Sequence, residues 1–171
     1  MAVARIPLPG DLIKEYLELR PGGVLIWKKS PHRAIRVGTR AGRTRRHGHS
    51  QVTLKKQNYG YHRIVYYLAF GVDSLGFEID HINRDPTDNR PENLRLATPT
   101  ENKWNTTKRN NTSAGHRGIR KRFWGASWSW EATFRGQYVG AFSSLDEAIA
   151  AREALARKHA GEFYCEPRSG N

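Results

Sequence analysis

The chain has 171 residues, which suits one domain or two small ones. It carries 29 Lys and Arg against 16 Asp and Glu, and the net charge of +13 favours phosphate-rich partners. A single cysteine, Cys165, excludes a disulfide framework and a cysteine-rich zinc site. No apolar run approaches the ~20 residues of a membrane span, and the first residues lack a signal-peptide core. We therefore expect a cytoplasmic protein of a bacterium or phage-infected cell. A merely soluble basic surface, as in a ribosomal-type protein, is the plain alternative.

The first predicted elements are a helix and a strand. Asp11 precedes apolar residues at helical spacing from Leu12 to Leu17 and is expected to cap the helix. A Pro-Gly-Gly run at 21–23 ends that helix, and the apolar residues 24–27 predict a strand.

Residues 28–48 are rich in Arg and Gly and predict an extended arm or loose hairpin, with a disordered tail as the alternative. A basic arm from Arg33 to Lys56 would clamp phosphates, and its candidate DNA contacts are Arg43, Arg45 and Arg46.

The middle of the chain predicts a strand over 50–54, a turn over 57–60, and a helix over 61–70 that Gly71 ends. A short strand over 77–79 then leads to Asp80 and His81. Residues 82–92 hold two prolines and several Asp and Asn, which indicates a loop.

A strand and a helix follow the loop. Residues 93–97 predict the strand, and Thr98, Pro99 and Glu101 form a strong helix start with a capping box. Asn102 then lies just past the first turn and is expected to face the strands.

The acids of the chain are gathered around this strand, loop, strand and helix. Seven of the 16 acids lie from Asp73 to Glu101, whereas none occurs between Glu18 and Asp73, where twelve Lys or Arg do. Carboxylate and amide oxygens are ligands for hard divalent ions, and a histidine can act as general base near neutral pH. The pattern therefore suggests a metal-dependent enzyme that acts on nucleic acid.

The motifs here resemble the HNH endonucleases of phages and mobile introns. The resemblance rests on residues 80–85, 88–90, 92–95 and 101–105, with further similarity at 25–28 and 60–63. It implies a ββα-metal (His-Me finger) core in which His81 is the general base. It also implies that Asp80 and Asn102 hold one Mg²⁺ or Mn²⁺, without zinc, and that Asn93 supports the loop and His81. His62 falls outside the motif, and we interpret it as a packing or phosphate-contacting residue.

The C-terminal part predicts three strands and a helix. Polar residues 110–114 form the expected linker, followed by strands over 118–122, 127–134 and 137–142. A second capping box at 144–147 opens a helix with Leu145, Ala148, Ile149 and Leu155 toward a core.

This part is similar to the plant ethylene-response-factor type of DNA-binding domain. The similarity rests on residues 117–120, 130–132 and 139–142 ahead of the helix. It implies that a sheet face contacts double-stranded DNA, with candidate contacts Arg117, Arg120, Arg122, Trp128, Trp130 and Arg135. The stretch 124–128 is richer in Trp than the family pattern, so which Trp meets DNA is open.

The sequence thus predicts an α+β protein of two domains. Residues 1–109 would form an HNH nuclease domain with an N-terminal helix and basic arm, and residues 115–171 a small three-stranded antiparallel sheet packed on one helix. The predicted function is a metal-dependent DNA endonuclease, of homing type, that nicks or cuts both strands as a monomer or homodimer on DNA. A catalytically inactive DNA-binding regulator and a single-stranded RNA binder that stacks bases on aromatic residues are the alternatives.

Overall fold

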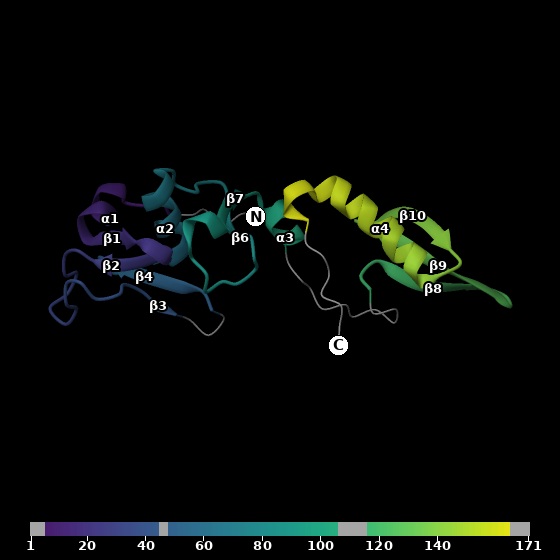
Figure 1. Cartoon of the computed structure of the whole chain (residues 1–171), viewed down its shortest axis with the longest axis horizontal. Coiled ribbons are helices and arrows are strands. Elements are labelled where there is room, and N and C mark those ends of the chain that lie inside the picture. The colour runs from purple at the N-terminus through teal and green to yellow at the C-terminus, as the bar shows by residue number, and fades with distance from the viewer. Residues whose placement is uncertain (1–5, 45–47, 106–115, 165–171) are drawn as a thin grey trace. The chain divides into compact units, whose positions relative to one another are not determined.

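The computed structural model describes residues 6–44, 48–105 and 116–164. The chain divides between Lys103 and Trp104 into two compact units, each with its own core (Figure 1). The linker predicted at 110–114 lies outside the described residues. Both units mix helices with small antiparallel sheets, in agreement with the α+β class. No helix among the described residues is long and apolar enough to span a membrane.

The N-terminal unit is built from helices and short strands around one central helix. In chain order its elements are α1 (Gly10–Tyr16), β1 (Leu17–Arg20), η1 (Pro21–Gly23), β2 (Val24–Trp27), β3 (Arg43–Thr44), β4 (Ser50–Leu54), β5 (Gln57–Gly60), α2 (Tyr61–Phe70), β6 (Glu78–His81), η2 (Pro91–Asn93), β7 (Leu94–Ala97) and α3 (Pro99–Trp104).

Helix α2 organises the core of this unit. Its side chains Tyr61, Ile64 and Val65 are fully buried among residues of β1, β2 and β4, and it contacts β6 and β7 as well. The Tyr61 hydroxyl accepts a hydrogen bond of 2.7 Å from the Leu25 backbone N–H. Gly71 ends the helix in a left-handed conformation, as the sequence predicts.

Three local predictions for this unit are wrong. Helix α1 begins at Gly10, so Asp11 lies in its first turn and does not cap it. Residues 17–20 do not continue the helix and instead pair with β2 as strand β1. Their apolar side chains reach the core from the strand, so the apolar spacing that suggested a helix is also satisfied by a strand. Residues 57–60 form strand β5, and the turn falls instead on Lys55 and Lys56, which both adopt positive φ.

The segment after β2 is ordered where the structure describes it. The Trp27 N–H donates to Thr39 O at 3.0 Å, the Gly38 N–H donates to Trp27 O at 2.8 Å, and Arg40 bridges to Ile26. The chain therefore folds back on β2 as a hairpin-like loop, which agrees with the loose hairpin and not with the disordered alternative.

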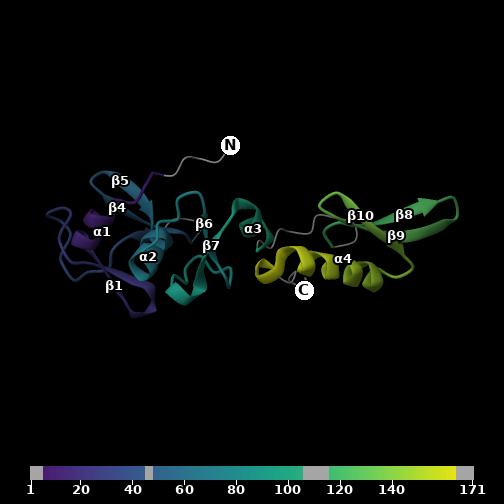
Figure 2. The ribbon, with the colours of Figure 1, turned by 90° about the horizontal axis from the view of Figure 1, so that it is seen from above.

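The C-terminal unit is a three-stranded antiparallel sheet covered on one face by a helix. Strands β8 (Ile119–Trp124), β9 (Ser127–Phe134) and β10 (Gln137–Phe142) lie in the order β10-β9-β8, and α4 (Leu145–Ala160) runs along them and ends in η3 (Gly161–Phe163) (Figure 2). Ser144 and Glu147 form the predicted capping box. Ile119, Ala132 and Ala148 form the buried centre between sheet and helix.

Candidate active site

The end of strand β6 carries the side chains for which chemistry was predicted. Asp80 and His81 are its last two residues, and both are buried. Strand β7 pairs with β6 in antiparallel register, with Asp80 opposite Arg95 and His81 opposite Leu94. Helix α3 follows β7, opened by the predicted capping box, in which Glu101 N–H donates to Thr98 Oγ1 at 3.2 Å and Thr98 N–H to Glu101 Oε2 at 2.7 Å.

His81 is oriented by Asn89, which the sequence analysis did not single out. The His81 Nε2 lies 3.3 Å from Asn89 Oδ1, and the Asn89 Nδ2 donates to Thr87 O at 3.1 Å. Because the Asn89 amide nitrogen is used by Thr87, its oxygen faces the imidazole and can only accept. Nε2 of a neutral His81 then carries the proton, which places the lone pair on Nδ1.

Burial lowers the pKa of His81 below its ordinary value, and the Coulombic effect of His49 acts in the same direction. The hydrogen bond to Asn89 and the charges of Asp80 and Asp85 oppose this shift. The net effect keeps the imidazole neutral, and so able to accept a proton, at neutral pH.

Asn93 holds the loop between β6 and β7 in one conformation. Its Oδ1 accepts from the Asn83 N–H at 3.0 Å, and its Nδ2 donates to Asn83 Oδ1 at 3.0 Å and to Asp88 O at 2.8 Å. Its carbonyl accepts from the Ile82 N–H at 2.9 Å. These contacts support the loop that carries Asn89, so Asn93 acts on His81 through that loop.

Arg90 makes the loop resistant to acid. Its side chain donates two hydrogen bonds of 2.9 Å to the carboxylate of Asp88, and these bonds lower the pKa of Asp88 to about 2. Asn83 donates to the same carboxylate at 2.8 Å. The Asp88 carboxylate therefore stays charged, and keeps these partners, over the whole neutral range.

Oxygen donors gather on one face of β6. Glu78 and Asp80 are two residues apart and share that face, and the Asn102 Nδ2 donates a short hydrogen bond to Glu78 Oε2. Arg95 donates from Nε and Nη2 to Asp80 Oδ2, both at 2.9 Å. Two carboxylates and an amide could hold a hard divalent ion with the help of water and phosphate. Among the described residues no group of three or more His, Cys, Asp or Glu is arranged to hold a metal.

Two further histidines lie beside His81. The ring centroid of His62, at the start of α2, is 5.5 Å from that of His81, and that of His49, just before β4, is 6.1 Å away. His49 and His62 are 5.9 Å apart. His62 therefore belongs to the site although it lies outside the predicted motif. No signal in the sequence around His49 indicates that it lies here.

The predicted DNA-contacting residues fall into separate places. Arg43 is exposed on β3, whereas Arg45 and Arg46 lie outside the described residues. In the C-terminal unit Arg120 and Arg122 lie on the sheet face opposite α4, and both bind the buried carboxylate of Glu131, at 2.6 and 3.4 Å. Arg117 precedes β8 and Arg135 lies in the β9–β10 turn, and both are exposed.

Trp128 and Trp130 lie on the other face of that sheet. The register pairs Trp130 with Lys121 and Trp128 with Phe123. These two pairs lie on the same face of the sheet as the core pair Ile119 and Ala132. Trp130 packs on this core, and the Lys121 ammonium lies 3.7 Å from the centroid of the Trp128 ring. On the arginine face the exposed tryptophan is Trp124, with the Arg122 guanidinium 5.6 Å from its ring centroid.

Comparisons with known proteins match the part of the chain that carries these side chains. The HNH endonuclease family model matches residues 59–103, the segment from β5 to α3. The chain is also 42% identical over 70 residues to Protein 3.8 of Escherichia phage T7, a match that covers 41% of this chain and 52% of that protein. The chain thus spans about half the length of this curated relative. No solved structure matches.

Residues 59–103 are therefore similar to an HNH endonuclease domain. The matched segment contains Asp80, His81, Asn89, Asn93 and Asn102. His49 and the C-terminal unit lie outside it.

A close approach of two backbones gives a first prediction. Gly22 and Gly23 both adopt positive φ, of 77° and 73°, but a Cβ at Gly23 would lie 2.0 Å from Asn89 O, whereas one at Gly22 would meet nothing within 4 Å. We expect Gly23→Ala to displace Asn89 and to lower any nuclease turnover by about 10–100-fold, as loss of an orienting partner does elsewhere. Gly22→Ala carries the same backbone strain and is the matched control. Equal loss in both variants, measured with thermal melting as reference, would contradict this account.

The second prediction concerns the protonation of His81. Because burial lowers its pKa in the folded protein, we expect the NMR titration of the His81 ring, without metal, to have a midpoint below that of the same protein's histidines in denaturant. In the pH range between the folded and unfolded pKa values the unfolded chain binds more protons, so His81 costs stability as the pH falls. A midpoint at or above the denatured value would contradict the assigned burial.

Proposed function

We propose that this protein is a divalent-metal-dependent DNA endonuclease with His81 as its general base. The observation that carries the proposal is the geometry of His81: its Nε2 lies against the accepting Oδ1 of Asn89, which assigns the proton of the neutral imidazole to Nε2 and the lone pair to Nδ1, and oxygen donors lie on the same strand. The strand–loop–strand–helix order of β6, β7 and α3 is that expected for a ββα-metal core. The match to HNH endonucleases supports the reaction class.

Hydrolysis of a phosphodiester requires that a water oxygen bonds to phosphorus while one P–O ester bond breaks. In the proposed reaction His81 Nδ1 takes the proton of this water, and Asn89 stabilises the imidazolium that forms through its bond to Nε2. Asp80 and Asn102 would hold a Mg²⁺ or Mn²⁺, with Glu78 beside Asn102. Such an ion, when bound, would offset the charge that builds on the phosphate and leaving oxygen.

Arg95 has a defined part in this proposal. It pairs with the buried Asp80 carboxylate through a hydrogen bond from Nε and an ion pair from Nη2, both of 2.9 Å, which stabilises that buried charge. If Asp80 holds the ion, the Arg95 guanidinium beside it could also contact the phosphate.

The C-terminal unit is proposed to bind double-stranded DNA through the sheet face that α4 leaves open. Glu131 holds the side chains of Arg120 and Arg122 and reduces the rotamer freedom that they would lose on binding. Paired Arg forks on a sheet can contact guanine edges in the major groove. We assign Trp124 to this surface and assign Trp128 and Trp130 to the opposite face.

The third prediction tests the reaction. We expect supercoiled plasmid to be nicked or linearised with Mg²⁺ or Mn²⁺ and to remain intact with EDTA. His81→Ala should lose cleavage by at least about 10²-fold, since general-base catalysis contributes that much. His32→Ala, which changes an exposed histidine, should cleave as wild type does.

A wild-type protein that binds DNA but cuts no substrate with any divalent ion would overturn the proposal. It would favour instead an inactive DNA-binding regulator. If a metal-dependent activity survives His81→Ala undiminished, the enzyme stands but the assigned base is wrong.

The fourth prediction tests the DNA-binding face. We expect Arg122→Ala and Trp124→Ala to weaken binding of a cognate duplex about tenfold or more, since a specific Arg contact is worth roughly 1–3 kcal/mol. Trp128→Ala and Lys158→Ala, which lie on the α4 side of the sheet and on α4, should change affinity less than threefold. Fluorescence anisotropy at fixed salt measures this. A larger loss for Trp128→Ala than for Trp124→Ala would show that the other face binds.

A further inference from the structure

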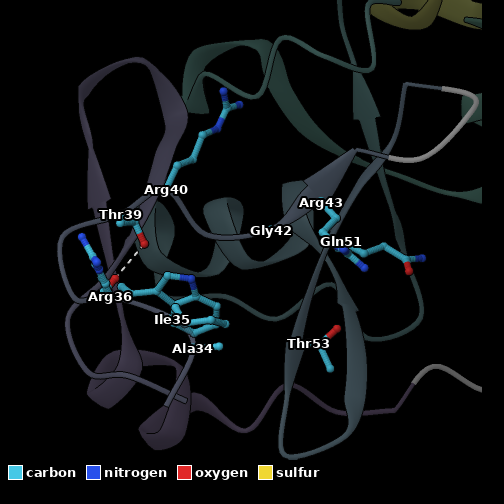
Figure 3. Close-up of a pocket in the computed structure, with 10 residues that line it drawn as sticks. Ala34, Ile35, Arg36, Thr39, Arg40, Gly42, Arg43, Gln51 and Thr53 are labelled. Atoms are coloured by element: carbon cyan, nitrogen blue, oxygen red, sulfur yellow. Dashed lines mark hydrogen bonds between the residues drawn. The ribbon is translucent and has the colours of Figure 1, made fainter. Parts of the chain in front are cut away.

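A pocket separate from the His81 site opens between β4 and the loop that follows β2. Its cavity volume is about 400 Å³, within the range of ~300–1,000 Å³ typical of small-molecule sites. Trp27 and Ile35 form its apolar part, and Arg36, Arg40 and Arg43 also line it. In Figure 3 the side chain of Arg40 extends away from the other labelled residues. No described lining residue is an acid, so the pocket attracts anions.

The pocket is built in advance by backbone and side-chain hydrogen bonds. Trp27 is bound through its N–H to Thr39 and through its carbonyl to Gly38, and the Thr39 hydroxyl donates to Arg36 O at 2.7 Å (Figure 3). Gly42 closes against Tyr61, where a Cβ would come within 2.9 Å of the ring. A ligand therefore meets a shaped surface whose ordering has no further entropic cost.

The polar groups of the pocket favour a ligand that has N–H donors as well as a phosphate. Oε1 of Gln51 is buried and has no hydrogen-bond partner among the described residues. An unpartnered buried acceptor is costly, so turning the Gln51 carboxamide into the pocket would let a ligand N–H donor relieve that cost. A phosphate dianion or diester carries no N–H, whereas a nucleobase offers amino or imino N–H groups and a flat face for apolar contact.

We propose that this pocket binds one unstacked nucleotide, with its phosphate at the arginines and its base against Ile35, Trp27 and Gln51. The inference rests on the proposed function only for its place on DNA. Gln51 and Thr53 lie on the face of β4 opposite to the buried Val52 and Leu54, and His49, which precedes the strand, lies in the histidine cluster. His49 and Gln51 are two residues apart, a separation of ~7 Å along an extended chain, which matches about two nucleotides along a DNA strand.

The location defines a class of substrate. A base reaches such a pocket only if it leaves the stack, which costs a few kcal/mol in a duplex and least at mismatched or unpaired positions. The protein would therefore prefer DNA with an unpaired nucleotide one or two positions from the cut.

Nucleotide binding by the full chain tests the pocket without any cleavage. In EDTA, NMR titration with the four deoxynucleoside monophosphates should shift the Trp27 indole N–H saturably. Inorganic phosphate and the deoxynucleosides should bind at least about fivefold more weakly. Arg40→Ala and Gln51→Ala should each weaken binding severalfold, about tenfold for the arginine, since charge-assisted bonds are the stronger class. Arg33→Ala, in the same loop but outside the lining, is the matched control.

Two results would overturn the inference. Equal affinity for phosphate and nucleotide would make the pocket a simple anion site, and the absence of a saturable shift would mean that it binds neither. In a second arm, the His81→Ala protein is mixed with duplexes that carry 2-aminopurine at successive positions along one strand, and fluorescence should rise at one or two of them and should not rise with Gln51→Ala. Because neither arm requires cleavage, failure of the endonuclease proposal and failure of the pocket give different results.

Discussion

The hydrogen bonds of Asn93 are the constraint on which the proposed active site depends. The loop between β6 and β7 has no strand partner of its own, so its backbone is fixed by side-chain amides and carboxylates. Asn93 bridges Asn83 and Asp88 across the base of the loop. The bridge supports the loop from which Asn89 contacts the imidazole of His81. Asn93 would therefore act on the proposed base through a second residue, Asn89.

Most of the acids that drew attention in the sequence serve the structure. Asp73 binds the buried Arg63 at 2.7 Å and accepts from the Leu8 N–H, which ties α2 to the N-terminal segment. Asp85 and Asp88 close turns of the loop, and Glu101 completes a helix cap. Glu78 and Asp80 are the two that face the proposed metal site. The concentration of acids in this region follows from the loop, whose polar turns require oxygen acceptors, and a metal site would require the same atoms.

The helices and strands were predictable where the residue pattern fits only one kind of secondary structure. Helix α2, strands β4, β9 and β10, and both capping boxes follow from periodicity and cap chemistry alone. Strand β1 was not, because Leu17 and Leu19 suit either a helix or a strand edge until their partner at β2 is known. His49 was also beyond prediction, since only the β3–β4 hairpin brings it to His81. The faces of the C-terminal sheet required the register, which set Trp124 with the arginines and apart from Trp128.

The approach of Gly23 to Asn89 shows that the folded unit around His81 extends beyond the segment that matches the HNH family. The turn at Pro21–Gly23 lies directly against the backbone of the loop that carries Asn89, although it precedes residue 59, where the family match begins. The matched segment and the segment that folds as one unit are therefore different. A fragment of this chain cut at the limits of the match would keep Asp80, His81 and Asn102 and would lose the turn that packs against the Asn89 backbone.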